Sequence, residues 1–172
     1  MYTNLFTMIK IDSSSLIFLI KLDLFDHIKR LYQEIAISPE VKVEVVDQGK
    51  KNNYADAFIV EALINHDKIK IHNLPPTYII PSIKKIHSGE LEIIYCAYEE
   101  KCVIIIDDIQ AQRYASTLGL SFRTVPFLLI ELLEKKLITQ VEFETIFHKT
   151  IILLNLPPKE ILYIQKCKEL LR

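Results

Sequence analysis

Two adjacent carboxylates follow one of the most apolar stretches in this sequence. Residues 103–106 read Val-Ile-Ile-Ile, and Asp107 and Asp108 come directly after them. Like charges this close raise each other's pKa, so the pair is unfavourable unless something compensates it. A helix N-terminus is one compensation, because its free backbone N–H groups donate hydrogen bonds to a carboxylate. A bound cation, held together with other acids, is the second.

Three further acids lie where an expected strand passes into an expected helix. Asp12 ends the first strand and precedes three serines, and Glu44 lies about a turn and a half into the helix after the second strand. Glu90 lies at the start of another helix, on the same face as Ile94 and Ala97. Each acid, taken alone, is also explained as a helix cap, a first-turn acid or a surface residue.

The elements that must position these acids alternate along the chain. Short β-branched runs predict strands at 7–11, 35–38, 68–72, 102–106 and 121–125. Helical patterns lie near 15–33, 39–65, 88–100, 109–118, 126–136, 139–153 and 158–171. This alternation predicts an α/β fold, with a five-stranded parallel sheet covered by helices on both faces and further helices at the C-terminus.

In an open parallel sheet, ligands bind at the carboxyl ends of the strands. The acids are therefore expected to meet at one edge, where their mutual repulsion favours a cation or protonation. An all-oxygen ligand set is typical of Mg²⁺ or Mn²⁺. Such an ion can activate a water and stabilise the oxygens of a phosphodiester, so the pattern favours metal-assisted hydrolysis.

The composition of the chain limits the number of domains and the kind of nucleic-acid-binding surface that can be expected. The chain has 172 residues, a formal charge of -1 and three glycines, which indicates one element-rich domain and no global basic surface. Any nucleic-acid contact must then come from a local basic face, for which the lysine pairs at 50–51, 84–85 and 135–136 are candidates.

The cysteines and the apolar runs bear on where the protein works. Cys96, Cys102 and Cys167 are odd in number and lack CxxC spacing, which indicates reduced thiols and a cytoplasmic protein. No apolar run is long enough to predict a membrane span, and no signal peptide is predicted.

Other catalytic patterns are missing from the sequence. The five histidines form no HxxxH motif and lie near no cysteine pair, and no GxSxG, P-loop or GxGxxG is present. A phosphatase with a DxD motif after the first strand is also disfavoured, because the residue two positions after Asp12 is Ser14.

The segments IDSSSLIFLIKL, SPEVKVEV, SGELEIIYCA and IIIDDIQAQRYASTLGLSFRTVPFLLIELLEKKLI together resemble the PIN-domain ribonucleases. The resemblance covers roughly residues 8–140 and is strongest to an uncharacterised prokaryotic branch akin to VapC toxins. It implies a PIN-like three-layer α/β/α fold and a Mg²⁺- or Mn²⁺-dependent hydrolase.

The resemblance also assigns roles to the acids. Its first acid falls on Asp12, its helix-borne glutamate on Glu44, and the acid that opens the next helix on Glu90. The acid at the end of the fourth strand falls on Asp107 or Asp108, whose register stays open. The predicted metal ligands are thus Asp12, Glu90 and either Asp107 or Asp108. All five acids form the predicted catalytic set. Ser14 is predicted to bind a metal-bound water.

These inferences lead to a prediction for the whole chain. We expect a PIN-like nuclease domain over 1–140 and a C-terminal helical extension over 141–172 packed on it. The expected function is a metal-dependent endoribonuclease, for which the resemblance implies the role of the toxin in a toxin-antitoxin pair; the alternative is an inactive PIN-like interaction or regulatory module. Expected partners are an RNA substrate, a second copy in a homodimer, and a protein antitoxin, with no membrane contact. The dimer rests partly on the apolar helices SLIFLIKL and FLLIELL.

Overall fold

A five-stranded parallel sheet forms the centre of the computed structural model, which describes residues 8–73, 83 and 86–171. The strand order is β3-β2-β1-β4-β5, and every neighbouring pair is parallel. The bounds are β1 (Met8–Ile11), β2 (Glu34–Ile37), β3 (Lys70–Ile71), β4 (Val103–Ile105) and β5 (Phe122–Arg123). The predicted parallel sheet is confirmed, with strands that are shorter than predicted at most ends.

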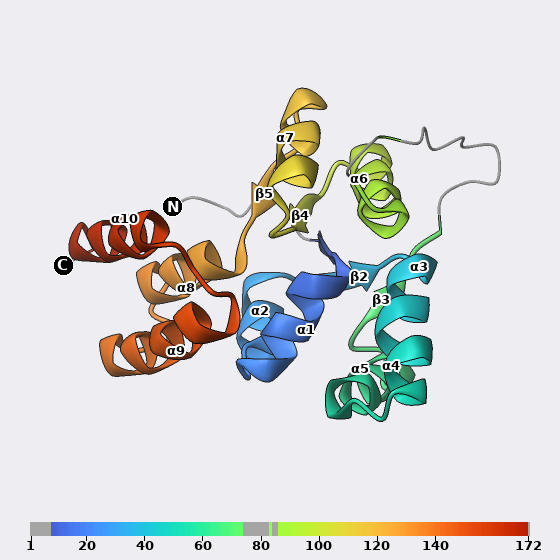
Figure 1. The fold of residues 1–172 in the computed structure, drawn as a ribbon, viewed down its shortest axis with the longest axis horizontal. Helices are drawn as coiled ribbons and strands as arrows, with labels where there is room; N and C mark the ends of the chain where they lie inside the picture. The colour runs from blue at the N-terminus through green and yellow to red at the C-terminus, as the bar shows by residue number, and fades with distance from the viewer. Residues whose placement is uncertain (1–7, 74–82, 84–85, 172) are drawn as a thin grey trace.

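Helices cover both faces of this sheet, which confirms the three-layer α/β/α arrangement (Figure 1). One face carries α1 (Ser13–Lys21), α2 (Phe25–Leu31), α3 (Pro39–Lys42), the π-helical segment η1 (Val43–Gln48), α4 (Gly49–Lys51) and α5 (Ala55–Asn65). The other face carries α6 (Ser88–Glu100) and α7 (Ile109–Thr117). Right-handed crossovers explain the division, because the chain first moves from β1 toward β3 and then returns to β4 and β5.

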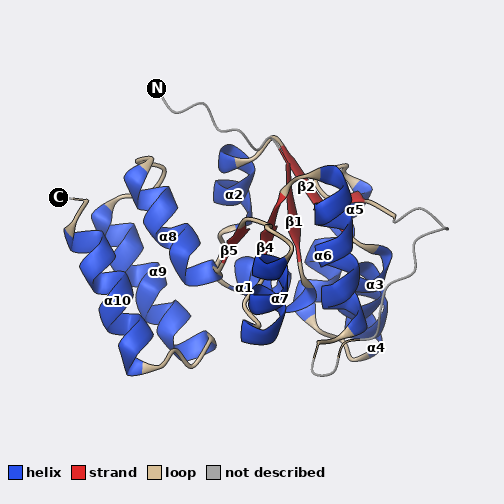
Figure 2. Cartoon of the chain, turned by 90° about the horizontal axis from the view of Figure 1, so that it is seen from above, coloured by secondary structure: helices blue, strands red, loops and turns tan. Residues whose placement is uncertain are grey.

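Three C-terminal helices lie beyond β5, at the side of the sheet (Figure 2). They are α8 (Val125–Glu134), α9 (Gln140–Leu153) and α10 (Pro158–Glu169), and both α9 and α10 pack on α8. The predicted strand at 121–125 was too long, since Thr124 accepts a hydrogen bond from Phe127 N and caps α8. The division of the chain at residue 140 stays a prediction.

The central strands of the sheet are buried on both faces, whereas the edge strand β3 is exposed. Ile9, Ile11 and Ile37 are completely inaccessible to solvent, as is the whole stretch from 103 to 106. Continuous burial explains why β4 reads as an unbroken apolar run, without the alternation of a sheet that has one wet face. The strand ends are therefore the places where polar groups of this sheet can meet solvent and ligands.

Two predicted long helices are each broken by a polar residue in the left-handed conformation. The helix predicted at 15–33 divides at Asp23, and the helix predicted at 39–65 divides at Asn53; both have a φ of 56°. At each break the next residue donates a backbone hydrogen bond five positions back, from Leu24 to Leu19 and from Tyr54 to Gly49. This is a Schellman-type ending, which short Asp and Asn side chains tolerate. Apolar periodicity alone did not reveal these breaks.

The two apolar helices on which the predicted dimer partly rests bury many of their apolar side chains inside the monomer. In α1 and α8, Leu16, Leu19, Leu128, Leu129 and Leu132 are fully buried. These side chains therefore leave no apolar surface to be covered by a second copy. The homodimer itself stays a prediction. Within the described residues, no helix combines the length and the apolar character needed to cross a bilayer.

A buried ion pair ties β1 to the end of α6. The side chain of Lys10 is 0% exposed, and its Nζ lies 3.0 Å from Oε1 of Glu100. The lysine has no other ion pair and no well-directed hydrogen bond in the described part of the chain. Glu100 is itself 2.9 Å from Nδ1 of His72, after β3. Burial raises the pKa of Glu100, but hydrogen bonding to His72 and the pairing with Lys10 outweigh it and lower this pKa.

Replacing Glu100 by Gln should destabilise the fold because it leaves the buried Lys10 ammonium without its counter-charge. Glu100 is partly exposed, so solvent moderates the loss and we expect roughly 1–3 kcal/mol of unfolding free energy. The double variant Lys10→Met, Glu100→Gln should recover most of it. Urea denaturation measures these differences, with exposed Glu99→Gln as the control. Equal stability of Glu100→Gln and the parent would contradict the pairing.

Candidate active site

Asp12 anchors the site at the carboxyl end of the central strand β1. Its Oδ1 accepts a hydrogen bond from Ser15 N at 2.9 Å, and its Oδ2 accepts one from the Ser14 hydroxyl at 3.1 Å. The residue is only 2% exposed and caps α1. The helix-cap explanation is therefore correct for Asp12, and the same contacts fix the direction of its carboxylate.

Glu44 reaches this edge of the sheet from η1, in the layer after β2. The Ser13 hydroxyl donates a hydrogen bond to its Oε2, which links η1 to the first turn of α1. A Cβ placed on Gly89 would lie 3.6 Å from each of the two Glu44 carboxylate oxygens. The first turn of α6 therefore lies close to the Glu44 carboxylate, and the tightest contact of a Cβ there would be 3.3 Å to Cγ of Glu40.

Glu90 comes from the opposite face of the sheet, in the first turn of α6. Its Oε2 accepts a hydrogen bond from the backbone N–H of His87 at 2.9 Å. Ile93, Ile94 and Ala97 are buried, which confirms the predicted inward face of this helix. The half-buried Glu90 lies at the start of that face.

A small polar cavity collects three of the predicted acids. Its volume is about 240 Å³, and it is lined by Asp12, Ser13, Ser14, Glu44, His87 and Glu90. The acids come from three separate parts of the chain and from both helical layers. Convergence at the carboxyl edge, inferred from the order of the elements, therefore holds for Asp12, Glu44 and Glu90.

The two adjacent aspartates after β4 have different surroundings. Asp108 caps α7, and its Oδ1 accepts hydrogen bonds of 2.8 Å from Gln110 N and from Ala111 N. Its Oδ2 has no hydrogen-bond partner among the described residues, and its charge acts on Glu90. Asp108 is thus near enough to Glu90 to act on its pKa, although it is not among the residues that line the acid cavity.

Asp107 lines a different, larger pocket. Its Oδ2 accepts a hydrogen bond from the Ser15 hydroxyl at 2.8 Å, and its Oδ1 accepts one from Val125 N at 3.1 Å. These bonds join β4 to the starts of α1 and α8. The structure therefore gives the two aspartates different neighbours, which the sequence could not distinguish.

Burial and like charge act together on these carboxyls. Burial is the main cause that raises the pKa of Asp12 to about 6, and the charge of Asp107 adds to it. The pKa of Glu90 is raised by burial and then by Asp108 and Asp12, against the hydrogen bond from His87. These acids are thus close enough to destabilise one another's charged forms, a situation that a cation would relieve.

The donor set suits a hydrated divalent ion better than a tightly caged one. Within the described residues, no three His, Cys, Asp or Glu side chains are gathered closely enough to hold a metal by themselves. Mg²⁺ keeps several of its waters and commonly uses only one or two carboxylates, with phosphate oxygens completing its shell. Hard carboxylate oxygens around a polar cavity fit such an ion, with Asp12 and Glu90 as the direct candidates.

Sequence reasoning missed some of the residues that organise the site. It singled out Ser14 but assigned no role to Ser13 or Ser15, which bind Glu44 and Asp107 respectively. It also did not predict that His87 is part of the site, although this side chain lines the acid cavity. The run of three serines after Asp12 was the available signal, since consecutive residues in a first helical turn point in different directions.

The fold and the cavity together indicate a class of protein, namely α/β proteins that gather acidic side chains at the carboxyl edge of a parallel sheet. A family model described as a PIN domain matches residues 8–151. The chain belongs to the PIN domain family. PIN domains are typically nucleases and generally use divalent metal ions.

Comparison with solved structures agrees with this assignment at the level of the fold. The chain is similar to a PilT N-terminus domain protein from the hyperthermophilic archaeon Sulfolobus solfataricus P2, with a TM-score of 0.53 and 18% sequence identity. The match covers 74% of this chain and 94% of that one. A search of curated proteins found no significant match.

Asp12→Asn should stabilise the metal-free protein at pH 7. The folded pKa of about 6 lies above the ordinary 3.8, so the folded state takes up the proton first and stability falls as pH rises between these values. Asparagine keeps the capping oxygen but carries no charge, so we expect a gain of up to ~3 kcal/mol. Urea unfolding with a chelator present measures it. The gain should shrink as the pH falls below about 6 and disappear near pH 4; a loss of stability at pH 7 would contradict this.

Proposed function

We propose that this protein is a metal-dependent endoribonuclease that hydrolyses RNA phosphodiester bonds. The observation that carries the proposal is the small cavity in which Asp12, Glu44 and Glu90 converge at the carboxyl edge of the sheet. A divalent ion, when bound in such a site, stabilises charge on phosphoryl oxygens and lowers the pKa of a water. Membership of a family of nucleases supports the same conclusion.

The residues of the cavity have separable roles in this proposal. Asp12 and Glu90 would hold a Mg²⁺ or Mn²⁺ ion, Asp108 would add its negative charge near Glu90, and Ser14 and Ser15 keep Asp12 in its orientation through hydrogen bonds. Glu44, fixed by the Ser13 hydroxyl, orients the attacking water. Asp107 supports the start of α1 through Ser15 and does not face the cavity.

Electrostatics make the ion necessary for substrate to approach. Three carboxylates line the cavity, and they repel a phosphodiester unless a cation lies between them. The predicted basic face offers limited help, because Lys50 is 2.6 Å from Glu61 and is committed to that pair. Lys84 and Lys85 lie outside the described residues.

We further propose that the protein acts in the cytoplasm as a homodimer and that an antitoxin protein occludes its site. The resemblance to toxins of toxin-antitoxin pairs supports this. The alternative, an inactive interaction or regulatory module, is favoured by the lack of a preformed three-ligand metal site in the described part of the chain. Metal binding and cleavage separate the two possibilities.

Purified protein should cleave single-stranded RNA when Mn²⁺ or Mg²⁺ is present and should stop when a chelator is added. Asp12→Asn should lower the cleavage rate by about a hundredfold or more, because one direct ligand loses its charge. The matched control is Asp26→Asn, the same chemical change at an exposed position in α2. Fluorescent RNA fragments resolved on a gel give the rate. An Asp12→Asn enzyme with undiminished turnover would refute the assignment.

Mn²⁺ should also raise the unfolding midpoint of the parent protein, because a ligand that binds only the folded state stabilises it. At a hundred times the dissociation constant the gain is about 2.7 kcal/mol. Asp12→Asn should lose most of this shift and Asp26→Asn should keep it. Thermal unfolding monitored by circular dichroism measures both. An interaction-only module should show no Mn²⁺-dependent shift in any of the three proteins.

A further inference from the structure

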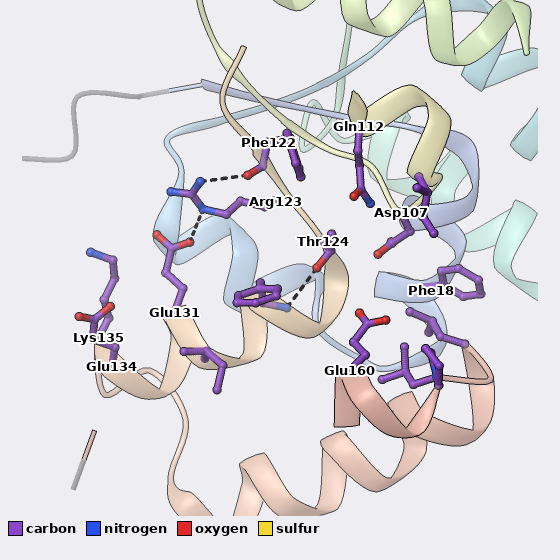
Figure 3. A pocket seen from close by; sticks show the side chains of 16 residues that line it. Phe18, Asp107, Gln112, Phe122, Arg123, Thr124, Glu131, Glu134, Lys135 and Glu160 are labelled. Atoms are coloured by element: carbon purple, nitrogen blue, oxygen red, sulfur yellow. Dashed lines mark hydrogen bonds and ion pairs between the residues drawn. The ribbon is translucent and has the colours of Figure 1, made fainter. Parts of the chain in front are cut away.

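A second and larger pocket is lined by Asp107, which does not line the acid cavity (Figure 3). Its volume is about 760 Å³, which is in the range of small-molecule sites. It lies between the starts of α7 and α10, strand β5, helix α8 and the loop after α9. Its walls are mostly apolar and include three phenylalanines: Phe18, Phe122 and Phe127.

The charges of this pocket are unevenly distributed. At one end Arg123 Nε lies 3.1 Å from Glu131, with Glu134 and Lys135 nearby, so opposite charges balance there (Figure 3). At the other end the carboxylates of Asp107 and Glu160 point toward one another (Figure 3). No basic side chain lines that end, and in the whole pocket acidic residues outnumber basic ones by four to two.

The acidic end is built from groups that the fold already holds in place. Asp107 is fixed by Ser15 and Val125, and the charge of Glu160 raises its pKa in addition to the larger effect of burial. The Glu160 carboxylate makes no hydrogen bond or ion pair with any described residue. Helix α10, which carries Glu160, is held against α8 partly by the contact of Tyr163 with Phe127, whose ring centroids are 5.6 Å apart.

The chemistry of the lining selects among possible ligands. A phosphate or nucleic-acid backbone would meet an excess of negative charge. A hydrated Mg²⁺ needs oxygen ligands and would leave the aromatic walls without a role. An ammonium or guanidinium group satisfies the two carboxylates by charge-assisted hydrogen bonds, while an attached apolar body covers the phenylalanine rings.

We propose that this pocket binds a small organic cation, with its charged head between Asp107 and Glu160 and its apolar body against Phe127 and Ile130. Binding in this pocket is separate from nuclease activity and is measured directly. The pocket is connected to the acid cavity, because Asp107 accepts a hydrogen bond from the Ser15 hydroxyl and Ser15 N donates one to Asp12. A ligand bound at Asp107 is therefore connected to Asp12, a proposed metal ligand, through the two hydrogen bonds of Ser15.

The experiment compares phenethylamine with 2-phenylethanol, which has a similar apolar body and no charge. Isothermal titration calorimetry on the parent protein should show binding of the amine, and the alcohol should bind about tenfold more weakly, as expected for the loss of one charge-assisted contact. Equal affinity for the two, or no binding of the amine at millimolar concentration, would overturn the proposal.

Two variants locate the ligand within the pocket. Glu160→Gln should weaken amine binding about tenfold, while Glu134→Gln, at the charge-balanced end of the same pocket, should stay within about twofold of the parent. Neither residue is assigned to the acid cavity, so RNA cleavage without amine should be unchanged in both. The site would be wrong if both substitutions weakened binding equally, or if neither did.

Discussion

The structure depends on keeping several negative side chains at one edge of a parallel sheet whose central strands are buried. Asp12 is the extreme case, because it is almost completely inaccessible and its pKa is raised to about 6. Burial of a carboxylate opposes folding unless hydrogen bonds or a cation compensate it. Here the starts of helices supply part of that compensation through backbone N–H groups. The residual repulsion is what makes the edge receptive to positive charge.

The three serines after β1 contact carboxylates that line two different pockets at this edge of the sheet. Ser13 holds Glu44 and Ser14 contacts Asp12 on the cavity side, whereas Ser15 bonds Asp107 on the side of the larger pocket. One turn of helix thus orients three carboxylates that come from distant parts of the chain. Both pockets are acidic, but only the larger one has aromatic walls, so they favour different cations: a hydrated metal ion in one and an organic cation in the other.

Stabilising contacts elsewhere keep this arrangement rigid. The buried Lys10 neutralises Glu100 at the far end of α6, so the helix that presents Glu90 is tied to the central strand at its other end. The first turn of α6 lies close to the Glu44 carboxylate at Gly89. The positions of the acids are therefore set by packing of whole elements, and a change remote from the cavity can displace them.

Local patterns were enough to predict much of this protein. Strand-helix alternation determined the parallel sheet and its two helical layers, and the strand-ending positions of Asp12 and the two aspartates after β4 located the edge that carries the acids. These features follow from backbone geometry and apolar periodicity, which act over a few residues. The breaks at Asp23 and Asn53 depend on left-handed cap conformations, which periodicity does not report. Only the tertiary structure decided that Asp107 and Asp108 have different neighbours. Asp107 is oriented by Ser15 and Val125, which the fold brings to β4 from distant parts of the chain. Asp108 is oriented by backbone N–H groups in the first turn of α7, directly after it.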